Sequence, residues 1–595
     1  VKTRPVSRSH WCTPHTRYTH THTLLASDGS VRLVLLHDDI RIIGPPDKLR
    51  PVYERLKAAL ATHGSVVQPK KSRFTYYHEQ PLPADVVEWI RAEQFAYETD
   101  ATEVAGGVVA KTVEAGQRKV VEMVQAMHPY FKLVGSEFMP VQHGLRLLRN
   151  CGPARTTYLF RTTRPEFTND GAQLVEEYTF DCLSRKLDMP IDPDSELSHQ
   201  VRLAVKEGGI GPFRDQRKLR SLAWLSSVAA CRQYLVPEDR KEQMSVPFTK
   251  SADAVLQHVR DTIGSMSEKS QQALAFIDEL LPESGEQFSD FYGRDPSRAT
   301  GLQSQLSAIL SVQTLLASSL NTDTPRLASL LRPGAGEFLT APLTSPSVRL
   351  SDAETIHAIR HRLGLPPSSN PEDLKEPQCL VCGRDLVASD PDHSLTCTRN
   401  TATQKNRRHH TIKNSLATWS RRAGAATSVE PINWSLARTD NKRVDLEIDL
   451  NTATYQVDVV ITNSTAPSNA KNDGGIGAVA RAEARKRHKY RAFHQPERGL
   501  KVQAFALDSY GALGDDAIDL VHKIAEYATD RSPEGLTSAD IRSGLIAELS
   551  ADNARANARM SQSWITKQRR ARRQRTQLRQ LVSSVANNQL GLAAR

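Results

Sequence analysis

Three cysteines and one histidine lie between residues 379 and 397 of a chain that has only 7 cysteines in 595 residues. Cys379 and Cys382 form a Cys-x2-Cys pair, and His393 and Cys397 complete the stretch CLVCGRDLVASDPDHSLTC. Three thiolates and one imidazole make a closed tetrahedral ligand set for Zn²⁺. The alternative is a chance cluster of buried cysteines acting as small apolar side chains. The spacing favours zinc, and four protein ligands imply a structural ion.

A second group of acidic residues lies in residues 442–461, KRVDLEIDLNTATYQVDVVI. Acidic side chains occur at every second position from Asp445, so they share one face of a strand. Asp458 interrupts an apolar strand, where an unpaired carboxylate is costly to bury. A two-residue turn at Asn451 and Thr452 would place Asp445 directly opposite Asp458, close enough for both to bind a divalent cation. The alternative is an acidic surface strand beside one structural aspartate.

Asp38 and Asp39 form a third acidic pair, inside the stretch VRLVLLHDDIRIIGP. The pattern predicts two short apolar strands joined at the acidic pair, followed by a helix in DKLRPVYERLKAAL. Polymerases use aspartates of this kind to bind two Mg²⁺ ions, but an Asp-Asp turn is also common in purely structural positions. Lys70 and Lys71 then return positive charge toward the pair.

Basic residues gather in two further segments. NRRHHTIKNSLATWSRRAG predicts an amphipathic helix with an apolar face and a cationic side. Its cationic side would contact phosphate groups, or would simply be solvated. The run TKQRRARRQRTQLRQ near the end of the chain predicts a disordered tail or a helix that binds a phosphate backbone without reading sequence. The candidate nucleic-acid contacts are Lys70, Lys71, Arg407, Arg408, His409 and Lys413.

Composition narrows the class of protein. The net charge of +11 favours a polyanionic partner, with nucleic acid as the first expectation. Sparse, unevenly spaced cysteines argue against a disulfide framework and for a reducing compartment. No apolar run reaches the roughly 18 residues that would span a bilayer, so we expect no membrane partner. The first residue is Val and the first segment begins in mid-domain, which suggests a fragment.

Several independent motifs then occur in a specific order. The Cys-x2-Cys and His-x3-Cys pairs, the Arg408-His409 dipeptide, Asp445, Asp458 and the helix AEARKRHKY resemble the carboxyl-terminal endonuclease of site-specific non-LTR retrotransposons. The resemblance covers roughly residues 375–530 and includes FALDSYGALG. It implies a restriction-enzyme-like nuclease of the PD-(D/E)xK type, preceded by a zinc knuckle.

The segment around LHDD resembles part of a reverse-transcriptase palm, from the YxDD hairpin through Gly-Pro-Pro and a helix to QPKKS. Leu36 stands where the family has tyrosine, and only Asp28 is acidic upstream of the pair. CGPARTTYLFRT and KEGGIGP resemble the segments that follow the palm, which extends the resemblance to about residues 31–530. Without an earlier palm strand that carries a carboxylate, polymerase activity is expected to be incomplete in this chain.

The resemblance also assigns roles to individual residues. Asp445 and Asp458 would hold the catalytic Mg²⁺ or Mn²⁺, although Val444 stands where the family usually has proline. The family's lysine is missing at its usual place, which is Val460, so it must come from AEARKRHKY. The candidates are Lys486 and Lys489, with Asp38 and Asp39 as the polymerase carboxylates.

The predicted fold is multidomain α+β. Its parts would be a truncated palm remnant (1–75), an α-helical thumb and connector (76–335), a linker (336–374), a zinc knuckle with basic helix (375–425), a small α/β nuclease (426–530) and a basic helical or disordered tail (531–595). The predicted function is metal-dependent nicking of duplex DNA in the nucleus, which primes RNA-directed DNA synthesis on the element's RNA. The alternative is a decayed or domesticated, non-catalytic nucleic-acid-binding protein. Oligomeric state stays open.

Overall fold

The computed structural model describes residues 30–36, 39–235, 257, 301–318, 323–386, 392–400, 402–431, 443–470, 475–491 and 494–593. These residues form a mixed α+β structure, as predicted. None of the described helices is both long and apolar enough to cross a membrane. The chain divides into two compact units, the first made of Val1–His128, Ala154–Val175 and Gln216–Leu306, and the second of Pro129–Pro153, Glu176–Asp215 and Ser307–Arg595.

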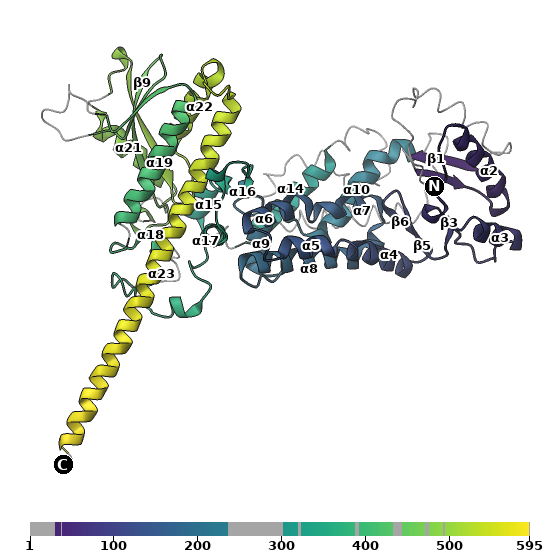
Figure 1. The fold of residues 1–595 in the computed structure, drawn as a ribbon, viewed down its shortest axis with the longest axis horizontal. Coiled ribbons are helices and arrows are strands. Elements are labelled where there is room, and N and C mark those ends of the chain that lie inside the picture. The colour runs from purple at the N-terminus through teal and green to yellow at the C-terminus, as the bar shows by residue number, and fades with distance from the viewer. Residues whose placement is uncertain are drawn as a thin grey trace. The chain divides into compact units, whose positions relative to one another are not determined.

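The first unit combines short strand pairs with helices (Figure 1). Its strands are β1 (Arg32–Leu36), β2 (Asp39–Ile43), β3 (Arg73–Thr75), β4 (Ala96–Glu98), β5 (Ala101–Val104) and β6 (Gly107–Ala110). Its helices are α2 (Pro46–Thr62), η1 (Pro69–Lys71), α3 (Ala84–Ala92), α4 (Val113–Gln125), α7 (Ala154–Thr162) and α10 (Gln216–Leu235). Aromatic side chains hold α2 and α3 together, with Tyr53, Phe74 and Trp89 in one buried cluster.

The predicted hairpin is confirmed, because β1 and β2 pair antiparallel with Leu36 opposite Asp39. Asp38 lies outside the described residues, and for Asp39 only the backbone position is described. Lys70 and Lys71 lie in a short 3-10 turn. Pro69 begins this turn, η1, because the fixed φ of proline suits the first position of a helical turn. Lys71, the last residue of η1, is exposed.

The second unit begins with helices that are distant in sequence from its sheet. They are α6 (Val141–Cys151), α9 (Glu196–Arg202), η2 (Val205–Glu207), α15 (Thr324–Leu330), α16 (Glu337–Thr340), η7 (Pro346–Val348), α17 (Asp352–Arg362) and η8 (Pro371–Leu374). Three more helices have residues in both units: α5 (His128–Gly135), α8 (Pro165–Leu187) and α14 (Leu302–Leu316). The helical region 76–335 is therefore divided between the two units.

Residues 336–374, which we expected to be a linker, are folded. Ser351 begins α17 with a capping box, accepting from the Glu354 N–H while Glu354 accepts from the Ser351 N–H. α16 and α17 pack against α6 and against the long helix α23 (Ser538–Ala593), and Ile359 is fully buried. Proline and serine in this segment mark helix starts rather than a flexible connection.

A four-stranded sheet forms the centre of the second unit. Its strands are β7 (Ala426–Val429), β8 (Leu446–Asp449), β9 (Thr454–Thr462) and β10 (Leu500–Asp508), in the spatial order β10-β9-β8-β7. β9 runs parallel to β10, whereas the other pairs are antiparallel. A parallel pair needs a crossover, and α20 (Pro467–Ala470), α21 (Ala478–Lys489) and η11 (Pro496–Arg498) lie within it.

The two faces of the sheet are covered by different helices (Figure 1). Tyr455, Val457 and Val459 point into the main core with α19 (Ala402–Arg422), α22 (Asp515–Tyr527) and α23. Side chains alternate along a strand, so Asp458 and Val460 point the other way, toward α21. The remaining short helices are α18 (His393–Thr396) and η12 (Ala528–Asp530).

Most of the carboxyl-terminal segment, expected as a basic helical or disordered tail, is the single helix α23. Ile541, Leu545 and Leu549 in its first half are buried in the main core, and Trp564 is buried further along. α23 contacts α17, α18, α19 and α22. Of the two alternatives for this segment, the described residues adopt the helical one, and its first half is packed in the core because its apolar residues recur at helical spacing and bury one face.

Candidate functional site

The four predicted zinc ligands come from two short elements. Cys379 and Cys382 lie on a tight turn in which the Gly383 N–H donates to the Cys379 carbonyl at 2.7 Å. Gly383 has φ +78°, a conformation that glycine adopts without strain. His393 begins α18 and Cys397 directly follows it, so both side chains reach the same point.

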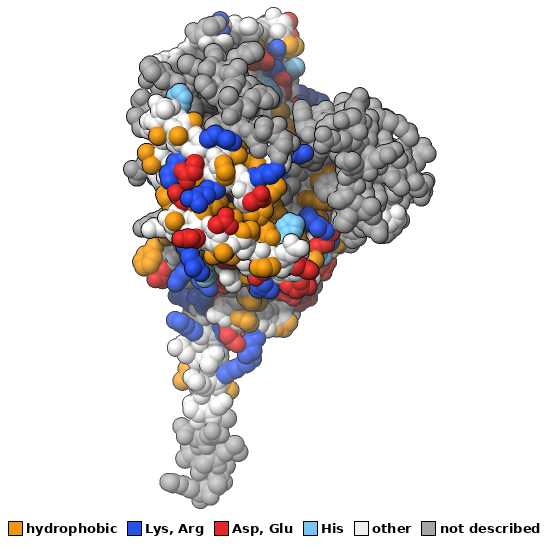
Figure 2. Space-filling view, turned by 90° about the vertical axis from the view of Figure 1, so that its right-hand side faces the viewer, with side chains coloured by type: hydrophobic (Ala, Val, Ile, Leu, Met, Phe, Trp, Pro, Cys, Tyr) orange, Lys and Arg blue, Asp and Glu red, His pale blue; other side chains and the backbone are white. Residues whose placement is uncertain are grey.

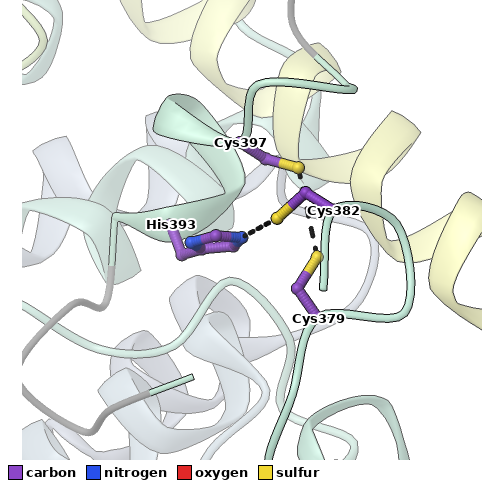
Figure 3. A group of neighbouring side chains, drawn as sticks. All are labelled: Cys379, Cys382, His393 and Cys397. Atoms are coloured by element: carbon purple, nitrogen blue, oxygen red, sulfur yellow. Dashed lines mark hydrogen bonds between the residues drawn. The ribbon is translucent and has the colours of Figure 1, made fainter. Parts of the chain in front are cut away.

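All four ligand atoms lie within 4.8 Å of one another, and Figure 3 shows the side chains turned toward a common centre. The Cys379 and Cys397 sulfurs are 4.0 Å apart, and the Cys382 sulfur is 3.5 Å from His393 Nε2. Bonds of about 2.0–2.3 Å to a central zinc ion place tetrahedral ligands at roughly such separations. The cluster can therefore hold a metal ion such as Zn²⁺.

Two donors from α23 lie behind the ligands. Trp564 Nε1 donates to the Cys379 sulfur at 3.4 Å, and Gln568 Nε2 donates to the same sulfur at 3.3 Å. The pKa of the Cys379 thiol is lowered, chiefly by the hydrogen bond from Cys397 and further by His393, backbone and Trp564 donors. These contacts favour the thiolate, which is the form that binds zinc.

Asp392, next to the ligand His393, connects the knuckle to the sheet. Its Oδ1 lies 3.1 Å from His361 Nε2 on α17, and its Oδ2 accepts from the Tyr510 hydroxyl at 2.9 Å. Thr465, which follows β9, donates to the same Oδ2. Burial opposes ionisation of Asp392, but His361 and these donors hold its pKa at about 2. The charged carboxylate thus fixes three segments to one point.

The two predicted nuclease carboxylates lie opposite each other. Leu446 pairs with Val457, and the Asp445 N–H continues the ladder by donating to the Val457 carbonyl at 3.0 Å. The same register places Asp445 opposite Asp458. The hairpin closes at Asn451, which has φ +62°, so the predicted two-residue turn is confirmed.

Each of these carboxylates has a cationic neighbour. Asp445 Oδ2 accepts from the Val459 N–H at 2.8 Å and lies 3.1 Å from His409 Nε2 on α19. Asp458 is 4% exposed and forms an ion pair with Lys486 on α21. The hydrogen bond with Asp445 raises the pKa of His409, and His409 in turn lowers the pKa of Asp445 against the opposing effect of burial.

The two candidate lysines have different partners. Lys489 donates to the Tyr490 hydroxyl at 2.8 Å, and that hydroxyl donates to the Arg443 carbonyl at 2.9 Å. Lys486 is half-buried and pairs with Asp458. The geometry therefore brings Lys486 to the carboxylates and gives Lys489 a role in holding Tyr490.

A divalent ion fits the Asp445 and Asp458 pair only with additional ligands. Among the described residues, the Cys/His cluster is the only group of three or more potential protein ligands close together. Mg²⁺ commonly binds one or two carboxylates and completes its shell with water and substrate oxygens. Asp445 and Asp458, 13 residues apart along one hairpin, supply this minimal set.

Two of the residues predicted to contact nucleic acid are buried. Lys413 is buried and forms an ion pair with Glu430 at 2.5 Å, so it is a structural residue of the α19 and β7 region. Arg408 is also buried, and its guanidinium donates to Asn557 Oδ1 at 2.6 Å. Arg407 is exposed as expected, whereas no side-chain position is described for Lys70. The predicted helix is present, but α23 covers part of its polar side.

Sequence reasoning missed Glu483, which is buried on α21. Its Oε1 accepts from the Asp516 N–H at 3.1 Å and so caps the first turn of α22. Burial, reinforced by the Asp516 carboxylate, raises the pKa of Glu483 to about 7. Basic residues follow it from Arg485 to Lys489, and the sequence carried no local signal that this glutamate reaches another helix.

No protein-family model matches the chain, and a search of curated proteins finds no significant match. The function must therefore be argued from the motifs and from the geometry of the two sites.

Proposed function

We propose that this chain is part of a reverse transcriptase and endonuclease of the non-LTR retrotransposon type, and that its second unit nicks duplex DNA with a divalent metal ion. The observation that carries the proposal is the opposition of Asp445 and Asp458 on one hairpin, with Lys486 paired to Asp458. Two carboxylates and a lysine at one point of a small mixed sheet are the residue types that metal-dependent phosphodiester cleavage needs.

Each residue of this site has a separate role in the proposed cleavage. Asp445 and Asp458 would hold Mg²⁺ or Mn²⁺, which supplies Lewis-acid activation of the scissile phosphate and of water. Lys486 places a positive charge where negative charge develops on the phosphate. His409 is a positioning residue, because it fixes the orientation of the Asp445 carboxylate through Oδ2.

The Cys/His cluster takes a structural role in this proposal. Zn²⁺ on Cys379, Cys382, His393 and Cys397 would fasten α18 and the Cys-x2-Cys turn to α23, with no position left open for a substrate. Asp392 would then transmit this anchoring to the β9 and β10 ends of the sheet. The ion therefore stabilises the unit that carries the carboxylates.

The wider expectations belong to the same proposal. The nick would leave a 3'-hydroxyl that primes RNA-directed DNA synthesis in the nucleus, with the element's RNA as template. Asp39 begins β2 at the predicted hairpin tip, which supports a palm-like hairpin and no more. Polymerase activity of this chain alone is not part of the proposal.

The test is nicking of supercoiled plasmid by the full chain with Mg²⁺ or Mn²⁺. We expect Asp458→Asn to reduce the nicking rate by about 100-fold or more, since it removes a charge from the metal site. Asp519→Asn is the matched control, because Asp519 is an exposed residue of α22 that pairs with Lys523. Metal-independent DNA binding with no nicking by the unmodified chain would instead support the non-catalytic nucleic-acid-binding protein.

A further inference from the structure

A basic hollow open to solvent lies between α19 and α23, apart from both sites described above. Four arginines line it: Arg407, Arg408, Arg555 and Arg559. The proposed cleavage chemistry uses none of them. A ligand in this hollow would meet four guanidinium groups.

The charges around the hollow do not balance. Asp552 is the one carboxylate in its lining, and it already accepts from Ser415 and pairs with Arg555 at 2.5 Å. Glu354, outside the lining, lies 3.5 Å from Arg559 and 4.0 Å from Arg555. The lining therefore keeps a surplus of positive charge, which attracts an anion.

Arg408 gives the second, independent observation. It is 5% exposed, and its Nε is buried without a hydrogen-bond partner. Burial lowers the pKa of Arg408 to about 10, against the opposing effect of the Asp508 carboxylate, and Arg408 stays charged at neutral pH. A buried guanidinium with an unsatisfied N–H is costly, and an anion in the hollow would offset that cost.

We propose that this hollow binds a phosphate group of a nucleic-acid backbone. Guanidinium groups present paired N–H donors that match phosphate oxygens. Arg408 precedes His409, which contacts Asp445, so one turn of α19 carries both the hollow and a neighbour of the cleavage site. The inference deepens the proposed function and rests on it, since it names a second point where the duplex is held.

The continuation of α23 favours a backbone phosphate over free phosphate. Arg570 lies 11 residues beyond Arg559, which is about three helical turns and places both on one side of the helix about 16 Å apart. Arg570 and Arg573 are exposed, and Figure 2 shows Lys and Arg side chains along the exposed part of α23. A row of cations leading from the hollow suits a polyanion better than one small ion.

Ion pairs hold this part of α23 in place. Arg569 forms two hydrogen bonds to Asp373, at 2.7 and 2.8 Å, and Arg572 lies 3.4 Å from Glu376. Arg569 and Arg572 therefore face the segment that leads into the knuckle. Arg570 and Arg573 have no ion pair with Asp373 or Glu376. The basic row is thus presented on a fixed side of the helix.

The experiment measures duplex binding by the full chain in an Asp458→Asn background, so that cleavage plays no part. The test variant is Arg407→Gln with Arg559→Gln, both exposed residues whose replacement leaves buried Arg408 in place. The control is Arg421→Gln with Arg542→Gln, which removes two exposed charges from the same helices. The probe is a labelled duplex of about 30 base pairs, titrated at several salt concentrations.

We expect the test variant to bind about tenfold more weakly and its log Kd against log salt slope to fall by about one, the value for one lost phosphate contact. The control should keep the slope of the parent. Equal losses in both variants would overturn the site. A second experiment follows the binding of inorganic phosphate by ³¹P NMR. If phosphate binding depends on Arg407 and Arg559 but duplex binding does not, the assignment to a backbone phosphate fails. Absence of nicking in the unmodified chain would leave these binding results unaffected.

Discussion

Lys486 on α21 forms an ion pair with Asp458 in the middle of β9, whereas Lys489, three residues later, contacts Tyr490. Residues three apart on a helix differ by about 60° in direction, so only one of the two reaches the carboxylate. Glu483, one turn before Lys486, faces α22 and keeps this part of α21 against the sheet. The ion pair with Asp458 thus distinguishes Lys486 from Lys489 on the same basic helix.

Replacing the two lysines separately tests this selection. Lys486→Met should slow plasmid nicking by about 100-fold, because the positive charge beside Asp458 is lost. Lys489→Met should leave the nicking rate nearly unchanged and instead loosen Tyr490. Single-turnover nicking rates at saturating Mg²⁺ give the measurement. A larger loss in Lys489→Met than in Lys486→Met would reverse the assignment.

Zinc content tests the Cys/His cluster. The purified full chain should contain one zinc ion, and Cys379→Ser should lose it together with thermal stability, since metal binding contributes to folding. Cys151→Ser is the matched control, because Cys151 is exposed and lies outside the cluster. Metal analysis and thermal unfolding provide the readouts. Retention of one zinc ion by Cys379→Ser would remove that residue from the ligand set.

The indole of Trp564 provides a finer test of the same site. Trp564→Phe keeps most of the buried volume but removes the N–H that donates to the Cys379 sulfur. We expect about tenfold weaker zinc affinity, measured by competition with a chelator of known affinity. Trp419→Phe removes a comparable donor, to Glu548, without touching the cluster, and should not change zinc affinity. Equal effects of the two replacements would indicate general destabilisation instead.

The buried Glu483 predicts a pH dependence of stability. Its pKa is about 7 in the folded chain against an ordinary value of 4.5, so the folded state binds more protons between these values. The free energy of unfolding should therefore fall as pH rises from about 4.5 to about 7, by up to about 3 kcal/mol. Glu483→Gln keeps an oxygen that accepts from the Asp516 N–H and should remove this dependence.

Chemical denaturation near pH 5 and near pH 8 measures the effect. Glu497→Gln, an exposed replacement on η11, should follow the unmodified chain at both pH values. If Glu483→Gln shows the same pH dependence as the unmodified chain, Glu483 is ionised throughout and acts purely as a charged helix cap.

Local patterns predicted the parts of the structure that local chemistry controls. The Asn451 and Thr452 turn sets the register of its hairpin, so the opposition of Asp445 and Asp458 follows from the spacing alone. The Cys379 to Cys397 cluster follows from ligand type and spacing in the same way. Both predictions involve residues close in sequence, where backbone geometry leaves few arrangements.

Other features depend on elements far apart in sequence. Arg408 and Lys413 read as surface cations on an amphipathic helix, but α23 and Glu430 enclose them. The sequence of the last helix predicts a basic tail, but Trp564 donates a hydrogen bond to Cys379, 185 residues earlier in the chain. The pattern of residues in one segment does not show which residues of a distant segment it will contact.

The sequence by itself determined the Cys/His cluster and the carboxylate hairpin, and it narrowed the lysine to two candidates on one helix. These follow from side-chain chemistry and from the short range over which turns and helices act. Only the tertiary structure decided that Lys486 meets Asp458, that Glu483 caps another helix, and that α19 and α23 enclose a basic hollow. Such contacts depend on how whole helices pack on the sheet, and burial then sets which charges are solvated and which need a partner.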